Sequence, residues 1–220
     1  MDNELEYERC IYRKQSLGDK HVFDCPRYIE DISQFYSLLS ICEEAHKDEV
    51  IVLNVFCYGG CLSTTIAVYN ALRSTEATVY TINKGVAVSG GSVLLLAGDI
   101  IGYSPYSYTM IHTASTGIPC NVLPEVKGQA DHSHRRVETF YKDVYSGFVS
   151  EEELDTILKG TPLYINDDEH TSRLESLGRY REDAYNNYQN ESGEVILDRD
   201  SLLKKTKKEL VALITGTEEG

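Results

Sequence analysis

A serine among small residues and a histidine further along the chain are the two side chains with the most useful chemistry. Ser89 lies in the stretch GVAVSGG of residues 85–91, where small neighbours leave room for a substrate carbonyl. His112 follows an apolar run, and histidine is the side chain best suited to proton transfer near neutral pH. Each also has an ordinary structural interpretation: a serine that caps a helix, and a histidine at a strand end.

A pair of glycines earlier in the chain offers a third component. Gly59 and Gly60 follow the apolar run of residues 49–56. Consecutive glycines allow a tight turn and leave backbone N–H groups uncovered. Such groups can stabilise a negative oxygen during acyl transfer, whereas the ordinary interpretation is a simple turn.

Alternating strand and helix patterns surround these residues. Apolar runs predict strands at residues 49–56, 78–82, 100–103 and 108–111. Amphipathic or small-residue patterns predict helices at residues 30–46, 63–73, 89–97, 123–148 and 151–158. Strands and helices in this order predict β-α-β crossovers, a parallel sheet and therefore an α/β fold.

The composition changes near residue 180. We expect residues 1–180 to form one domain, residues 181–198 a polar linker, and residues 199–220 an amphipathic tail helix.

The overall composition excludes several classes of function. A net charge of −14 argues against a nucleic-acid partner. No apolar run is long enough to cross a membrane, and no apolar secretory segment opens the chain, so we expect a cytoplasmic location. The six cysteines are expected to be reduced. Cys57 and Cys61 lack further ligands nearby, which favours small apolar residues over a metal site.

The order of these motifs resembles the Clp protease proteolytic subunit family over roughly residues 10–180. That family has Ser-Pro-Gly-Gly where this chain has CYGG at residues 57–60. It has Gly-x-Ala-Ala-Ser-Met-Gly where this chain has residues 85–91, and Met-Ile-His where this chain has residues 110–112. The resemblance implies a Clp protease/crotonase-like fold of stacked β-α-β units with a protruding strand-helix handle.

The resemblance also implies roles for these residues. Ser89 would attack a peptide carbonyl, and His112 would take its proton and return it to the leaving amine. The backbone N–H groups of Gly60 and Gly90 would hold the oxyanion. No metal or cofactor is implied. The family assembles as homo-oligomers, expected here as heptameric rings stacked in pairs, with an AAA+ unfoldase supplying unfolded polypeptide.

The family's third catalytic residue, an aspartate, is missing from its expected position. Alignment of the segment after the long helix places Leu158 or Gly160 there. Three alternatives follow: a shifted acid serves instead, the enzyme works as a Ser-His dyad, or the chain is an inactive subunit that acts as a scaffold. The candidate shifted acids are Asp155, Asp167 and Asp168.

The divergence from the family motifs also bears on the origin of the chain. Divergence of this degree is typical of bacteriophage genomes, in which case the location would be the host cytoplasm.

Two other enzyme classes are rivals to the Ser-His peptidase interpretation. An acyl-CoA hydratase or isomerase on the same fold would need a glutamate near the oxyanion glycines, where this sequence offers Ser89 and His112. A Ser-Lys dyad would have to use Lys84.

Overall fold

Seven strands form one mixed sheet in the described part of the chain. A computed structural model describes residues 10–15, 20–114 and 123–192. The strand order is β1-β2-β3-β4-β6-β7, and β5 pairs with β4 beside β6. The pairs β1–β2 and β6–β7 are antiparallel and all others are parallel. The bounds are β1 Ile11–Gln15, β2 Lys20–Asp24, β3 Val50–Cys57, β4 Thr78–Val88, β5 Ile100–Tyr103, β6 Tyr108–Ile111 and β7 Leu163–Asn166.

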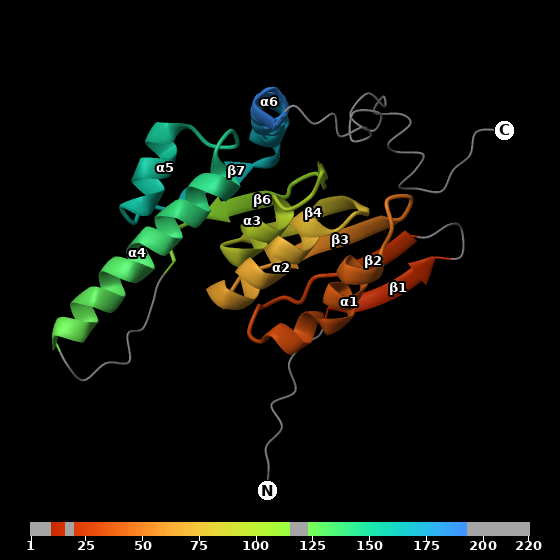
Figure 1. Ribbon diagram of the computed structural model, residues 1–220, viewed down its shortest axis with the longest axis horizontal. Helices are drawn as coiled ribbons and strands as arrows, with labels where there is room; N and C mark the ends of the chain where they lie inside the picture. The colour runs from red at the N-terminus through yellow and green to blue at the C-terminus, as the bar shows by residue number, and fades with distance from the viewer. Residues whose placement is uncertain (1–9, 16–19, 115–122, 193–220) are drawn as a thin grey trace, which may run out of the picture. The chain divides into compact units, whose positions relative to one another are not determined.

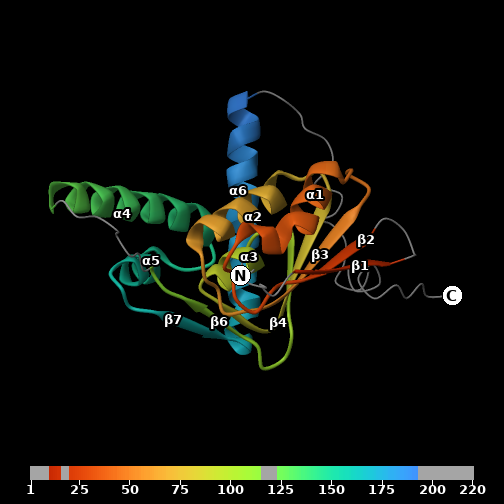
Figure 2. The same ribbon diagram turned by 90° about the horizontal axis from the view of Figure 1, so that it is seen from below.

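Three helices cover one face of this sheet, as Figures 1 and 2 show together. They are α1 (Tyr36–Glu44), which continues the 3-10 turn η1 (Ile32–Phe35), α2 (Leu62–Ser74) and α3 (Gly90–Leu95). Alternate residues of β3 face them: Ile51, Leu53 and Val55 are fully buried. Burial of each such side chain contributes on the order of 2 kcal/mol. The parallel strands and their crossover helices therefore pack as β-α-β units.

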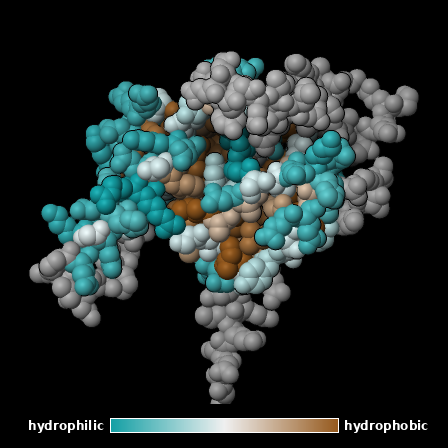
Figure 3. Space-filling view, in the orientation of Figure 1, coloured by the Kyte–Doolittle hydropathy of each residue, from teal (hydrophilic) through white to brown (hydrophobic). Residues whose placement is uncertain are grey.

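A second core lies beside α3 and is built by the C-terminal half of α4 (Leu123–Tyr145), by α5 (Glu151–Leu158) and by the start of α6 (Asp167–Ser192). Burial in α4 begins at Val137, and residues 125–136 are exposed or half-buried. Figure 1 shows this earlier part of α4 running away from the sheet, and Figure 3 shows its hydrophilic surface. It is the helical part of the expected handle.

The predicted fold class is confirmed, and three details differ from the sequence prediction. β4 does not end at residue 82 but continues through Val88, because Val86 to Val88 pair with β6 after an irregularity at Gly85. β1, β2, β7 and α6 were not predicted. Helix α6 also occupies residues 181–192, which we assigned to the linker, whereas residues 199–220 lie outside the described residues and their helix stays a prediction.

A partly buried ion pair joins α5 to α6. The guanidinium of Arg173 donates to both carboxylate oxygens of Glu153, at 2.9 and 2.7 Å, and also to the carbonyl of Phe148. The Arg173 side chain lowers the pKa of Glu153 to about 2. Because this folded-state pKa lies below that of an unfolded glutamate, the ionised carboxylate stabilises the fold above about pH 4.5. That stabilisation is lost as the pH falls toward 2.

The Glu153→Gln variant is expected to lower the free energy of unfolding by about 1.5–3 kcal/mol at pH 7, the range for hydrogen bonds to a charged group. The difference from wild type should shrink as the pH falls from 4.5 to 2. Urea unfolding at several pH values measures it. Glu138→Gln is the control, since Glu138 forms an exposed pair with Lys142 and should change stability by less than about 0.5 kcal/mol. A penalty for Glu153→Gln that does not depend on pH would contradict this account.

Candidate active site

Ser89 occupies a strained turn between β4 and α3. Its φ of 56° and ψ of −121° are unusual for a residue with a side chain, and such a conformation costs about 1–3 kcal/mol. Ser89 is the N-cap residue of α3, yet its side chain makes no capping hydrogen bond. The interpretation of Ser89 as a simple helix cap is therefore wrong, and its hydroxyl is not used by the end of the helix.

The pairing of β4 with β6 brings Ser89 and the region of His112 to one edge of the sheet. Val88 pairs with Met110, and the N–H of Ser89 donates to the carbonyl of Met110 at 2.8 Å. In this parallel register Ser89 lies opposite Ile111, and His112 is the next residue. Neighbouring strands are about 4.8 Å apart, so the two predicted catalytic residues are close neighbours at the ends of adjacent strands. Both are half-buried, which leaves them accessible.

The glycine pair lies against the serine turn. A Cβ on Gly59 would lie 2.6 Å from the backbone nitrogen of Gly90 and 2.7 Å from the Cβ of Ser89. A Cβ on Gly60 would lie 1.9 Å from the carbonyl oxygen of Ile29, and Gly60 has a φ of 149°. Neither position can hold a side chain without movement of the backbone, so the glycines permit a close approach at this site.

The two predicted oxyanion donors have their N–H groups outside the local hydrogen-bond pattern. The bridge to Ile29 uses the carbonyl of Gly59 and the N–H of Cys61, and leaves out the N–H of Gly60. Gly90 begins α3, where the first N–H groups have no partner within the helix. In the described part of the chain, no hydrogen bond involves the N–H of either glycine. Gly59, by contrast, donates to Cys57 Sγ at 3.3 Å.

A comparison with known families covers the part of the chain that holds these residues. The profile of the Clp protease family matches residues 9–153, which is more than half of the chain and includes both glycines, Ser89 and His112. The chain belongs to the Clp protease family. The resemblance inferred from the sequence motifs is thereby confirmed.

Two curated relatives belong to this Clp protease family as well. An ATP-dependent Clp protease proteolytic subunit of Deinococcus radiodurans is 34% identical over 132 residues, 59% of this chain and 64% of that protein. An ATP-dependent Clp protease proteolytic subunit of Pleurastrum terricola is 26% identical over 119 residues, 51% of this chain and 57% of that protein. The chain thus covers less than two thirds of the length of these relatives.

The three candidate acids of this Clp protease family member occupy different places. Asp155 is exposed on α5 and pairs with Lys159 at 2.5 Å. Asp167 Oδ2 accepts from the N–H of Tyr106 at 2.6 Å, and Asp168 is exposed at the start of α6. In the antiparallel register Tyr108 lies opposite Asn166, so the structure places Asp167 and Asp168 at the start of β6. His112 follows the other end of that strand, about 13 Å away along it.

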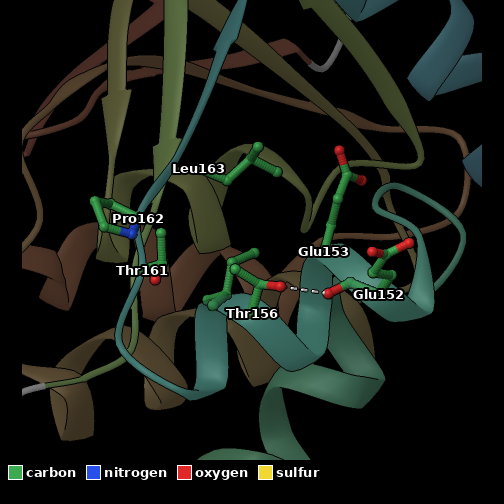
Figure 4. Close-up of a pocket in the computed structure, with 7 residues that line it drawn as sticks. Glu152, Glu153, Thr156, Thr161, Pro162 and Leu163 are labelled. Atoms are coloured by element: carbon green, nitrogen blue, oxygen red, sulfur yellow. Dashed lines mark hydrogen bonds between the residues drawn. The ribbon is translucent and has the colours of Figure 1, made fainter.

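Continuation of the β6–β7 register by one residue places His112 opposite Pro162, since Ile111 pairs with Leu163. Pro162 and Leu163 also line a pocket of about 270 Å³ beside α5, together with Glu152, Glu153, Thr156, Ile157 and Thr161. Figure 4 shows Leu163 directed toward α5 and Pro162 on the other side of the chain. Neither Ser89 nor His112 lines this pocket, so it is separate from the candidate active site.

Other features of this Clp protease family member bear on the rival interpretations. Lys84 is exposed within β4. Within the described ranges, no three His, Cys, Asp or Glu side chains gather closely enough to hold a metal ion. No helix among those ranges has both the length and the apolar character needed to span a membrane. Ile29 was missed as a site residue, because only the folded chain reveals that its carbonyl oxygen lies against Gly60.

Proposed function

We propose that this chain is a serine endopeptidase subunit of the Clp type, which cleaves unfolded polypeptides through an acyl-enzyme. The observation that carries the proposal is the strained, uncapped Ser89 at the edge where β4 and β6 end, next to the strand that leads into His112. Enzymes place a nucleophile on such a strand-to-helix turn because it exposes the hydroxyl. Membership of the Clp protease family supports the same activity.

The proposed reaction uses two side chains and two backbone amides. His112 accepts the proton of the Ser89 hydroxyl while the serine oxygen attacks the peptide carbonyl. The N–H groups of Gly60 and Gly90 stabilise the oxyanion, and each such donor contributes about a hundred- to a thousandfold in rate. His112 then protonates the leaving amine, and water hydrolyses the ester in a second round of the same chemistry.

The proposed partners follow from the names of the relatives, which are ATP-dependent proteolytic subunits. We expect homo-oligomeric rings, heptameric and stacked in pairs, that receive unfolded polypeptide from an AAA+ unfoldase. The cytoplasmic location and the bacteriophage origin stay predictions from the sequence.

Fluorophosphonate labelling of the folded protein tests the proposal. An activated serine forms a covalent bond to phosphorus, and the expected adduct maps to Ser89 in a peptide digest. No adduct at Ser89, in protein shown to be folded by circular dichroism, would end the proposal of serine peptidase activity.

One observation favours a second candidate, a weakly active or inactive ring subunit that acts as a scaffold. Leu158 or Gly160 occupies the expected position of the third catalytic residue, and Pro162 lies opposite His112. Among the described residues, no carboxylate forms a hydrogen bond with the imidazole of His112. A ring-forming protein that resists fluorophosphonate would fit this candidate.

A further inference from the structure

We propose that three hydroxyl groups position the catalytic pair. The hydroxyls of Tyr145 and Ser92 restrain the turn at Ser89, and the hydroxyl of Tyr141 restrains the backbone of His112. Tyr141 and Tyr145 belong to the last turns of α4, and Ser92 belongs to α3. The inference rests on the proposed function, because these groups would act by placing Ser89 and His112 for reaction. All three side chains are buried and would act through Ser89 and His112, so they are positioning residues.

Two sets of hydrogen bonds, here called branches, carry the proposal. The first branch joins Tyr145, Ser92 and Ser89, and its hydrogen bonds all run in one direction. Ser92 Oγ lies 2.6 Å from the carbonyl oxygen of Ser89 and 2.7 Å from the hydroxyl of Tyr145. A carbonyl oxygen can only accept, so the single proton of Ser92 points to Ser89. Tyr145 must therefore be the donor to Ser92. This order fixes the direction of the chain as Tyr145, Ser92 and then Ser89.

The carbonyl of Ser89 is the end point of several hydrogen bonds. In addition to Ser92 Oγ, it accepts from the backbone N–H of Ser92 at 2.9 Å and of Val93 at 3.3 Å. On the other side, the N–H of Ser89 donates to Met110. A residue persists in a strained conformation only where its surroundings over-determine it. These hydrogen bonds supply that restraint, and the relay from α4 strengthens it because hydrogen bonds in a chain polarise one another.

The second branch reaches the proposed base. The hydroxyl of Tyr141 donates to the backbone carbonyl of His112 at 2.9 Å. His112 lies just beyond the end of β6, so this hydrogen bond restrains a residue that the strand pairing no longer holds. Without it, movement of the backbone at residue 112 would displace the imidazole from the serine hydroxyl.

The two branches are joined on one helix face. Residues 141 and 145 are one turn apart, and their rings meet edge to face with centroids 5.1 Å apart. Both rings are almost fully buried. Burial raises the pKa of Tyr141 to about 12 and that of Tyr145 well above its ordinary value, so both hydroxyls keep their protons at any working pH. The end of α4 therefore presents two protonated donors, one to the carbonyl of His112 and one to the hydroxyl of Ser92.

Tyrosine-to-phenylalanine variants test the inference. Tyr141→Phe, Tyr145→Phe and Ser92→Ala are each expected to lower kcat for peptide hydrolysis by about three- to tenfold, the range for one hydrogen bond, with KM unchanged. The rate of fluorophosphonate labelling at Ser89 should fall by the same factor. Tyr103→Phe is the matched control, because the Tyr103 hydroxyl bonds to Thr171 and not to either proposed catalytic residue.

A double variant separates positioning from a general loss of stability. Tyr145 acts through Ser92 in this proposal. The double variant Tyr145→Phe/Ser92→Ala should therefore lose little more kcat than the more impaired of the two single variants. If the two substitutions acted independently, their fold-losses in kcat would multiply. Any of three results would overturn the inference. The first is a wild-type kcat and labelling rate in all three single variants, the second is multiplied losses of kcat in the double variant, and the third is a rise in KM without a loss of kcat. If one single variant fails to fold, the other two, compared with Tyr103→Phe, test the inference in the same way. An unlabelled wild type would instead overturn the proposed function, and the inference with it.

Discussion

Replacement of Ser89 with alanine is expected to abolish fluorophosphonate labelling and to slow peptide hydrolysis by at least about a thousandfold. In serine peptidases, loss of the nucleophile removes nearly all catalysis beyond that of the oxyanion donors and binding. The hydroxyl of Ser89 makes no capping hydrogen bond, so its removal costs α3 no capping interaction. The free energy of unfolding should therefore change by less than about 0.5 kcal/mol.

Purified wild type and Ser89→Ala, compared with the same fluorogenic peptides and the same labelling time, give this measurement. Ser63→Ala is a suitable control, because Ser63 is exposed on α2. Equal hydrolysis by wild type and Ser89→Ala would mean that any observed activity comes from a contaminant or from other chemistry. Loss of folding in Ser89→Ala would instead show that the serine is needed for the turn itself.

Pro162→Asp is expected to raise kcat by about ten- to a thousandfold. A triad that has asparagine in place of aspartate loses about four orders of magnitude, so a missing carboxylate leaves much to be gained. Pro162 is exposed and lies opposite His112 when the β6–β7 register is continued. Cross-strand neighbours have Cβ atoms about 5 Å apart, which allows a carboxylate on residue 162 to reach the imidazole.

Pro162→Asn is the matched control, since it has the same shape without the charge. Only the aspartate variant should gain activity, and its pH–rate profile should have its acid limb at a higher pH, because a nearby negative charge favours the protonated imidazole. Equal gains in kcat for the two variants would contradict the register argument. A gain in neither variant, with wild type active, would favour a site that already works as a dyad.

The position of the candidate site was predictable because the sequence pattern around it is local. Gly60, Ser89, Gly90 and His112 follow apolar runs whose order alone predicts parallel strands, and the carboxyl ends of such strands meet at one edge. The conformation of Ser89 was not predictable, because a positive φ in a residue with a side chain is imposed by its neighbours.

The parts that depend on pairing distant segments were not predictable. Gly85 indicated the end of a strand, whereas pairing with β6 carries β4 past it to Val88. The short strand β7 has little apolar pattern, so its antiparallel register, which separates Asp167 and Asp168 from His112, was not foreseen. In the sequence, Tyr141 and Tyr145 look like ordinary helix residues. The hydrogen bonds of their hydroxyls were not predictable, because they form only when α4 packs against α3.

β4 and β6 differ in length, and this difference affects the local unfolding of the site. β4 has eleven residues and is hydrogen-bonded to β3 along its length, with β5 and β6 on its other side. β6 has four residues, and its outer neighbour β7 also has four. Local opening should therefore cost less free energy at β6 and β7 than at β4. We expect the amides of β4, which leads into the proposed nucleophile, to exchange more slowly than those of β6, which leads into the proposed base.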